Sequence, residues 1–138
     1  MASFVLERTV NLPIERLWSL LADFSRAPTS DTPVTVLKAG DPKANGIGTI
    51  RKITIGRACV EERLESATPH SGFTYRVLGG APMKAYLGTV SLKDVGGKTL
   101  VRWSAELTPK IPMTGTICSK LAKRVANLLI DSVVREHC

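Results

Sequence analysis

The sequence has few cysteines and no long apolar run, and each shortage excludes a class of protein. Its three cysteines, Cys59, Cys118 and Cys138, are odd in number and widely spaced. They form neither a disulfide framework nor a zinc-type ligand pattern, so we expect reduced thiols, a cytoplasmic location, and no metal or other cofactor. No apolar segment is long enough to span a bilayer, and no signal-peptide pattern opens the chain. We therefore expect no membrane span.

The patterns that mark common catalytic sites are missing as well. The sequence contains no Ser-His-Asp arrangement and no phosphate-binding P-loop. Its two histidines, His70 in a predicted turn and His137 near the end of the chain, are poorly placed to act as buried bases. We therefore expect a binding protein rather than an enzyme. If a reaction is catalysed, Glu62 is the candidate acid/base residue.

Length and composition indicate one domain that spans residues 1–138. With 43% hydrophobic and 22% charged residues, the composition is that of an ordinary globular protein. The formal net charge of +7 permits an anionic ligand, a nucleic acid or an acidic lipid surface. The basic residues are spread along the chain, with no run longer than Lys123-Arg124, which indicates a solvated basic surface rather than a nucleic-acid site.

A long amphipathic helix is predicted from about Met113 to Glu136. Apolar residues recur there at helical spacing and form one stripe, made of Ile117, Cys118, Leu121, Ala122, Val125, Leu128, Leu129 and Val133. A stripe of that width must be buried against another element. Because most of the chain between Val34 and Pro109 has strand character, we expect the helix to lie on a sheet, where it either closes a core or leaves a cavity.

Seven strands and at least one short helix are predicted before the long helix. Alternating patterns and turn signals place the strands at Ser3–Leu12, Val34–Ala39, Gly48–Ile55, Ala58–Ala67, Phe73–Leu78, Lys84–Val95 and Lys98–Thr108. A short helix runs from Pro13 to about Asp23, and Phe24–Pro33 is either a second short helix or an irregular loop. Gly40–Gly46 is a turn-rich connection. The predicted fold class is therefore α+β, with a curved antiparallel sheet wrapped around the long helix.

A two-residue hairpin loop at Gly56-Arg57 determines which side chains share a face. Counting back from it puts Ile53 opposite Val60 and Arg51 opposite Glu62, on a face that is otherwise apolar. Two charges on such a face cost several kcal/mol unless they are paired and further hydrogen-bonded. Three interpretations stay open: a cavity with water or a polar ligand, a buried structural salt bridge, or a shifted register that places both charges outside.

A second tight loop at Gly96-Gly97 brings two small residues together. It places Gly88 opposite Ala105 on the apolar face, which leaves space there. The same face carries three apolar rings with polar groups, Tyr75, Tyr86 and Trp103. Their presence there is explained equally well by a pocket and by core packing.

The order of these elements and several local motifs resemble the START-like (SRPBCC) superfamily, whose fold is also called helix-grip. The motifs are Val10–Trp18 with Asp23-Phe24, then Gly48–Arg51, Glu62–Leu64, Phe73–Val77, Tyr86 and Val101–Trp103. The resemblance covers nearly the whole chain and is closest to the polyketide cyclase/dehydrase-like branch. It implies a cavity for a mostly apolar small molecule between sheet and helix. Because that superfamily includes lipid carriers, cyclases and plain binders, the fold does not determine the function.

The plant abscisic-acid receptors are similar more distantly, and in them the positions resembling Lys38, Glu62 and Tyr86 line the hormone pocket. Their gating loop is replaced here by the tight turn Ile55–Ala58, so the resemblance does not imply gated hormone sensing. Together, the face analysis, the helix stripe and the resemblance give one candidate ligand-binding set: Lys38, Arg51, Glu62, Tyr75, Tyr86, Gly88, Trp103, Leu121 and Val125.

Three functions from different classes stay open. The chain binds or carries a hydrophobic small molecule with one polar end, such as a lipid or a polyketide, and this is the function we expect. Alternatively it is a cyclase or dehydratase that uses the same cavity, with Glu62 as the base and Arg51 or Tyr86 stabilising an enolate. The third possibility is a basic interaction module for nucleic acid or protein, whose binding would depend steeply on salt.

Overall fold

The computed structural model describes residues 2–40 and 46–138, and that part of the chain forms seven strands and two helices. They are β1 (Ala2–Val10), α1 (Ile14–Ala22), β2 (Val34–Lys38), β3 (Ile50–Ile55), β4 (Ala58–Thr68), β5 (Gly72–Gly79), β6 (Met83–Val95), β7 (Lys98–Pro109) and α2 (Gly115–His137). Every predicted strand is present, as are the short helix and the long one, with ends within two residues of those expected. Most of the predicted connection Gly40–Gly46 lies outside the described residues.

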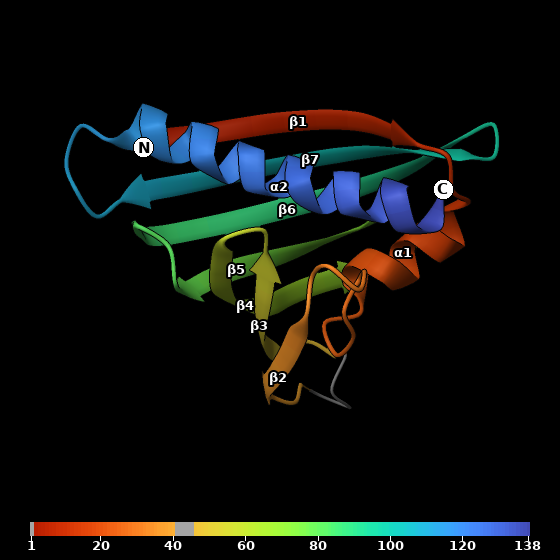
Figure 1. The fold of residues 1–138 in the computed structure, drawn as a ribbon, viewed down its shortest axis with the longest axis horizontal. Coiled ribbons are helices and arrows are strands. Elements are labelled where there is room, and N and C mark those ends of the chain that lie inside the picture. The colour runs from red at the N-terminus through yellow and green to blue at the C-terminus, as the bar shows by residue number, and fades with distance from the viewer. Residues whose placement is uncertain (1, 41–45) are drawn as a thin grey trace.

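All seven strands form one antiparallel sheet in the order β1-β7-β6-β5-β4-β3-β2. The strands follow one another in sequence except for β1, which pairs with the last strand, β7. The sheet curves, and α2 lies across its concave side (Figure 1). The predicted helix-grip arrangement of the α+β class is therefore confirmed.

The two tight hairpins have the registers predicted from their loops. In the β3–β4 hairpin Arg51 pairs with Glu62, and in the β6–β7 hairpin Gly88 pairs with Ala105. The loop of the second hairpin, Gly96-Gly97, has φ angles of 67° and 87°. A type I′ turn requires positive φ at both central residues, which glycine adopts without steric cost.

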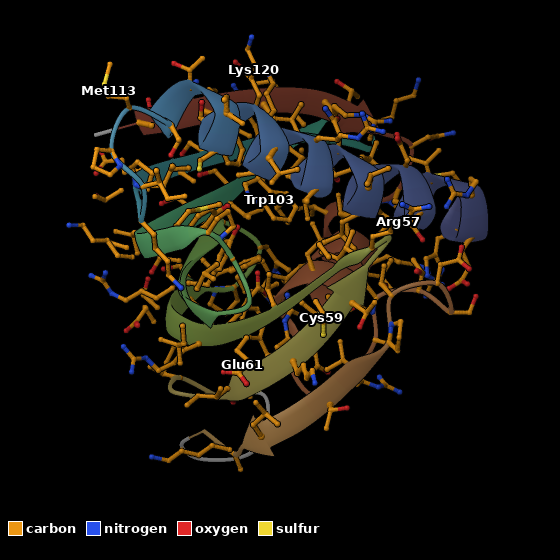
Figure 2. The ribbon with its side chains drawn as sticks, turned by 60° about the vertical axis from the view of Figure 1, so that its left-hand side comes forward. Arg57, Cys59, Glu61, Trp103, Met113 and Lys120 are labelled. Carbon is orange, nitrogen blue, oxygen red and sulfur yellow. The ribbon has the colours of Figure 1, made fainter. Side chains whose placement is uncertain are left out.

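The helix α2 packs against only part of the sheet. It lies closest to β1 and also contacts β7 and β3. Its buried residues are Cys118, Ala122, Ala126, Leu129, Ile130, Ser132 and Val133. Trp103 lies between the helix and the sheet, whereas Lys120 and the preceding Met113 extend into solvent (Figure 2).

The predicted apolar stripe on this helix was wrong in part. Ile117, Leu121 and Leu128 are exposed, whereas Ala126 and Ile130, which the stripe omitted, are buried. Helical spacing shows that apolar residues share a side of the helix, but the contact with β1 determines which edge of that side is covered. The buried face is therefore rotated toward Ala126 and Ile130.

The segment between α1 and β2 is irregular and contains no second short helix. It is held to the C-terminal end of α2 by hydrogen bonds. The hydroxyls of Thr29 and Ser132 lie 2.7 Å apart, and the Ser30 backbone N–H donates to Glu136 Oε1 at 2.9 Å. The Ser30 hydrogen bonds lower the pKa of the Glu136 carboxyl. The segment thus closes one end of the molecule and places Phe24 in the core, fully buried.

Candidate functional site

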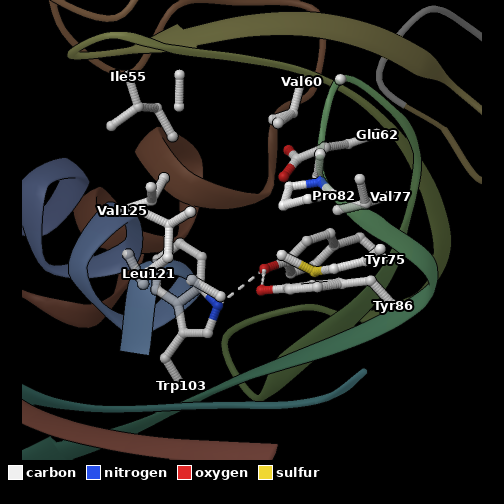
Figure 3. Close-up of a pocket in the computed structure, with 16 residues that line it drawn as sticks. Ile55, Val60, Glu62, Tyr75, Val77, Pro82, Tyr86, Trp103, Leu121 and Val125 are labelled. Atoms are coloured by element: carbon white, nitrogen blue, oxygen red, sulfur yellow. Dashed lines mark hydrogen bonds between the residues drawn. The ribbon is translucent and has the colours of Figure 1, made fainter. Parts of the chain in front are cut away.

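A cavity of about 120 Å³ lies between α2 and the inner face of the sheet, where the strand residues that line it come mainly from β4, β5 and β6. It is partly open to solvent, and most of its lining is apolar. The apolar side chains come from β3, β4 and β5, from the turn before β6, and from α2: they include Ile55, Val60, Val77, Pro82, Leu121, Ala122, Val125 and Ala126. Figure 3 shows these side chains surrounding the space, with three kinds of polar group among them.

A chain of hydrogen bonds links three aromatic side chains on one wall of the cavity. The Trp103 indole N–H donates to the Tyr75 hydroxyl at 2.9 Å, and the Tyr75 and Tyr86 hydroxyl oxygens lie 2.9 Å apart (Figure 3). All three residues are buried. Burial is the largest cause that raises the pKa of Tyr75 and of Tyr86, and the nearby Glu62 carboxylate raises both further. Both tyrosines are therefore neutral phenols near neutral pH, available as hydrogen-bond donors and acceptors.

The second polar feature is the Arg51–Glu62 ion pair across β3 and β4. Arg51 Nε and Nη2 donate to the same oxygen, Glu62 Oε1, at 3.1 and 2.9 Å. The two side chains are only 5% and 9% exposed. The guanidinium carbon lies 3.7 Å from the centre of the Phe24 ring, in cation–π geometry. Both charges thus point inward, as the predicted register requires, and an outward orientation is excluded.

Arg51 lies deeper than Glu62. Glu62 lines the main cavity, whereas Arg51 is not among its lining residues and instead lines, together with Glu62, a smaller neighbouring cavity of about 10 Å³. Within the described residues, Arg51 Nη1 has no hydrogen-bond acceptor. A molecule in the main cavity therefore meets the carboxylate of the pair and not the guanidinium.

The structure brings most of the predicted site residues together at the main cavity. The ones that line it are Glu62, Tyr75, Tyr86, Trp103, Leu121 and Val125. Lys38 does not: it is exposed on β2, an edge strand, where the register shifts between Val36 and Lys38. The pocket position that it resembles in the hormone receptors does not carry over to this chain.

The space predicted above Gly88 is filled. A Cβ atom at Gly88 would lie 2.3 Å from two ring atoms of Tyr75, the residue paired with it on the neighbouring strand. Gly88 therefore accommodates the Tyr75 ring and does not line the cavity, which corrects the prediction. A missing side chain leaves a cavity only where no large neighbour covers it.

Several of the lining residues were not predicted from the sequence. Ile55 and Val60 lie on the inward face that the hairpin register defines, so both could have been predicted from that register. The 80–83 turn, which contributes Gly80, Ala81, Pro82 and Met83, carried no such signal, because a turn has no alternating pattern. Ala122 belonged to the predicted helix stripe but not to the predicted ligand-binding set, and Ala126 belonged to neither.

The described residues, 2–40 and 46–138, lack two features that mark other classes of function. They contain no group of three or more His, Cys, Asp or Glu side chains that could hold a metal ion. Neither of the helices found there has an apolar stretch of the length needed to cross a bilayer.

The chain is similar to known proteins in both sequence and fold. The family described as "Polyketide cyclase / dehydrase and lipid transport" matches residues 1–136. A search of the curated proteins found no match. Among solved structures, protein XoxI from Bacillus cereus is similar at 20% identity and a TM-score of 0.76, covering 98% of this chain and 94% of that one.

Two further solved structures share the fold at lower sequence identity. A START superfamily protein from Mycobacterium smegmatis has 14% identity and a TM-score of 0.77, covering 96% of this chain and 94% of that one. Ara h 8.0201 has 14% identity and a TM-score of 0.70, covering 93% and 92%. At these identities the likeness concerns the fold alone.

Proposed function

Because the chain belongs to the polyketide cyclase/dehydrase and lipid transport family, we propose that it binds a hydrophobic small molecule in the cavity between α2 and the sheet. The apolar cavity carries this proposal. An engineered apolar cavity of about 150 Å³ stays dry and binds benzene, and the cavity here, at about 120 Å³, is of similar size. Transfer of apolar surface from water into such a space is favourable.

The size of the cavity limits what enters it. A ring compound or a short alkyl segment fits within about 120 Å³. Because the cavity is partly open, a longer lipid or polyketide would place one end inside while the rest passes Leu121, a lining residue that is 47% exposed. This geometry suits a carrier or a binding protein.

Titration with a neutral apolar fluorescent probe, N-phenyl-1-naphthylamine, tests the proposal. We expect saturable enhancement of probe fluorescence with the natural chain. Ala126→Phe, on the cavity wall, should abolish it while the protein stays folded. Leu128→Phe is the matched control, because it adds the same side chain to an exposed position of the same helix and should bind the probe normally. Equal binding by both variants would place the probe elsewhere and refute the cavity assignment.

A second candidate function is catalysis of a cyclase or dehydratase type in the same cavity. The observation that favours it is that the Glu62 carboxylate and the hydroxyls of Tyr75 and Tyr86 all face the space. A carboxylate could accept a proton next to a carbonyl, and a phenol could hydrogen-bond the resulting enolate. Turnover of a short poly-β-ketone that Glu62→Gln abolishes would support catalysis. Binding without turnover would support the binding protein.

A further inference from the structure

The aromatic chain on the cavity wall has one hydrogen that the protein does not use. The Trp103 indole and the two tyrosine hydroxyls carry three donor hydrogens between them. Only two hydrogen bonds connect them, from Trp103 to Tyr75 and between Tyr75 and Tyr86. Whichever tyrosine donates to the other, one hydroxyl hydrogen is left over. Among the described residues it has no acceptor, so the wall presents one hydrogen-bond donor.

The Glu62 carboxylate has an unused acceptor. Both hydrogen bonds from Arg51 end on Oε1, and no other described residue donates to Oε2. Glu62 is part of the lining of the main cavity, and Figure 3 shows its carboxylate facing the same space as the tyrosine hydroxyls. The wall therefore presents one acceptor, which carries negative charge, beside one neutral donor.

From this count we propose that the cavity selects apolar molecules whose polar end is a neutral hydroxyl group, held between Glu62 Oε2 and the hydroxyls of Tyr75 and Tyr86. This inference rests on the proposed binding function and specifies its ligand class. A hydroxyl donates one hydrogen and accepts another, so it satisfies both unused groups at once. Buried polar groups that lose their partners are costly, so the two unused groups discriminate between polar ends.

Other polar ends match the wall less well. A carboxylate has no hydrogen to donate, and it would bring a second negative charge beside Glu62 while Arg51 lies behind that residue. An ether accepts but does not donate, and an ammonium group donates but does not accept. The formal charge of +7 favours anions at the protein surface, so the cavity is predicted to have the opposite preference from the surface.

The test compares four naphthalene compounds by competition against N-phenyl-1-naphthylamine: naphthalene, 2-naphthol, 2-methoxynaphthalene and 2-naphthoate. They share one ring system and differ in the polar end. One hydrogen bond to a charged group corresponds to roughly a tenfold to hundredfold change in affinity. We expect 2-naphthol to bind about tenfold or more tightly than each of the other three. If 2-naphthoate binds as tightly as 2-naphthol, or all four bind equally, the hydroxyl preference is refuted while the binding function stands. If none of the four displaces the probe, the hydroxyl preference is refuted while the binding function stands, and if the probe itself does not bind, both proposals fail.

Two variants locate the preference. Glu62→Gln replaces the charged acceptor, so the ratio of 2-naphthol to 2-naphthoate affinity should fall about tenfold. Glu61→Gln is the matched control, because this neighbour points to the opposite face of β4, pairs in register with Lys52 and is not among the cavity-lining residues. Its ratio should equal that of the natural chain. An unchanged ratio in Glu62→Gln would overturn the proposal.

Tyr86→Phe serves as a second variant if Glu62→Gln does not fold. It keeps the ring and removes one of the two hydroxyls, so the unused hydrogen is then confined to Tyr75 and the ligand hydroxyl loses its contact with Tyr86. The affinity for 2-naphthol should fall severalfold, while that for naphthalene should stay within about twofold, because naphthalene makes no hydrogen bond there. Equal losses for the two compounds would show a general effect on packing and contradict the proposed contact.

Discussion

Removing the charges of the Arg51–Glu62 pair one at a time should destabilise the protein more than removing both. Both side chains are buried, and both hydrogen bonds of the pair end on one carboxylate oxygen. Breaking a buried ion pair by removing one partner leaves an uncompensated charge, which costs about 3–5 kcal/mol. Replacing both partners by residues of similar volume is often far milder.

The structure suggests where in that range each variant falls. Glu62→Gln keeps an amide oxygen that can accept from the guanidinium, so we expect a loss of about 3 kcal/mol. Arg51→Met leaves Glu62 charged, but Glu62 lines a partly open cavity and can be reached by water, so the loss should again be about 3 kcal/mol. A methionine also keeps a favourable contact with the Phe24 ring. The double variant should lose only about 1–2 kcal/mol.

Urea denaturation of the natural chain and the three variants measures these values, provided that the m-value is unchanged. With these losses the double-mutant cycle should give a coupling energy of about 4–5 kcal/mol. If the two single losses add to the double loss within about 0.5 kcal/mol, the two charges do not interact. That result would refute the buried pair and, with it, the placement of the carboxylate at the cavity.

Three further predictions test the surroundings of the cavity. Because burial raises the pKa of Tyr75 and Tyr86, the native protein should show no tyrosinate absorbance near 295 nm as the pH passes about 10. The free energy of unfolding should decline above that pH, because the tyrosines of the unfolded chain ionise there. Tyrosinate absorbance of the native protein at pH 10 would contradict the burial of the two hydroxyls. Gly88→Ala should lower the unfolding free energy by about 1–3 kcal/mol, because the new Cβ would displace the Tyr75 ring, whereas a neutral result would show open space there. Ile130 is 2% exposed and Ile117 is 69% exposed. In urea denaturation, Ile130→Ala should therefore lower the free energy of unfolding by about 2–5 kcal/mol, whereas Ile117→Ala should change it by no more than about 0.5 kcal/mol. Equal losses would contradict the rotated helix face.

The fold was predictable because its signals are local and mutually consistent. Period-two alternation marks the strands, and two tight loops at Gly56-Arg57 and Gly96-Gly97 determine the registers, which the structure reproduces residue by residue. A register, once known, also tells which side chains share a face. That Arg51 and Glu62 share a face followed from this rule, and their inward orientation followed from the apolar residues on the same face.

The cavity was less predictable because it depends on distances between elements that are remote in sequence. Whether Gly88 leaves a space depends on the rotamer of Tyr75 on the next strand. Whether Lys38 reaches the pocket depends on a register shift in an edge strand. Whether Leu121 or Ala126 is buried depends on the side from which β1 approaches the helix. None of these quantities is encoded in a single stretch of sequence.

The helix α2 both closes a core and bounds a cavity, and its sequence divides these tasks along its length. In its first half the buried positions are small, with Cys118, Ala122 and Ala126 spaced one turn apart. Short side chains there leave room that the opposite strands do not fill. In its second half the buried residues include Leu129, Ile130 and Val133, which fill the space against the sheet. Substitutions in the first half should therefore change binding more than stability, and substitutions in the second half should do the reverse.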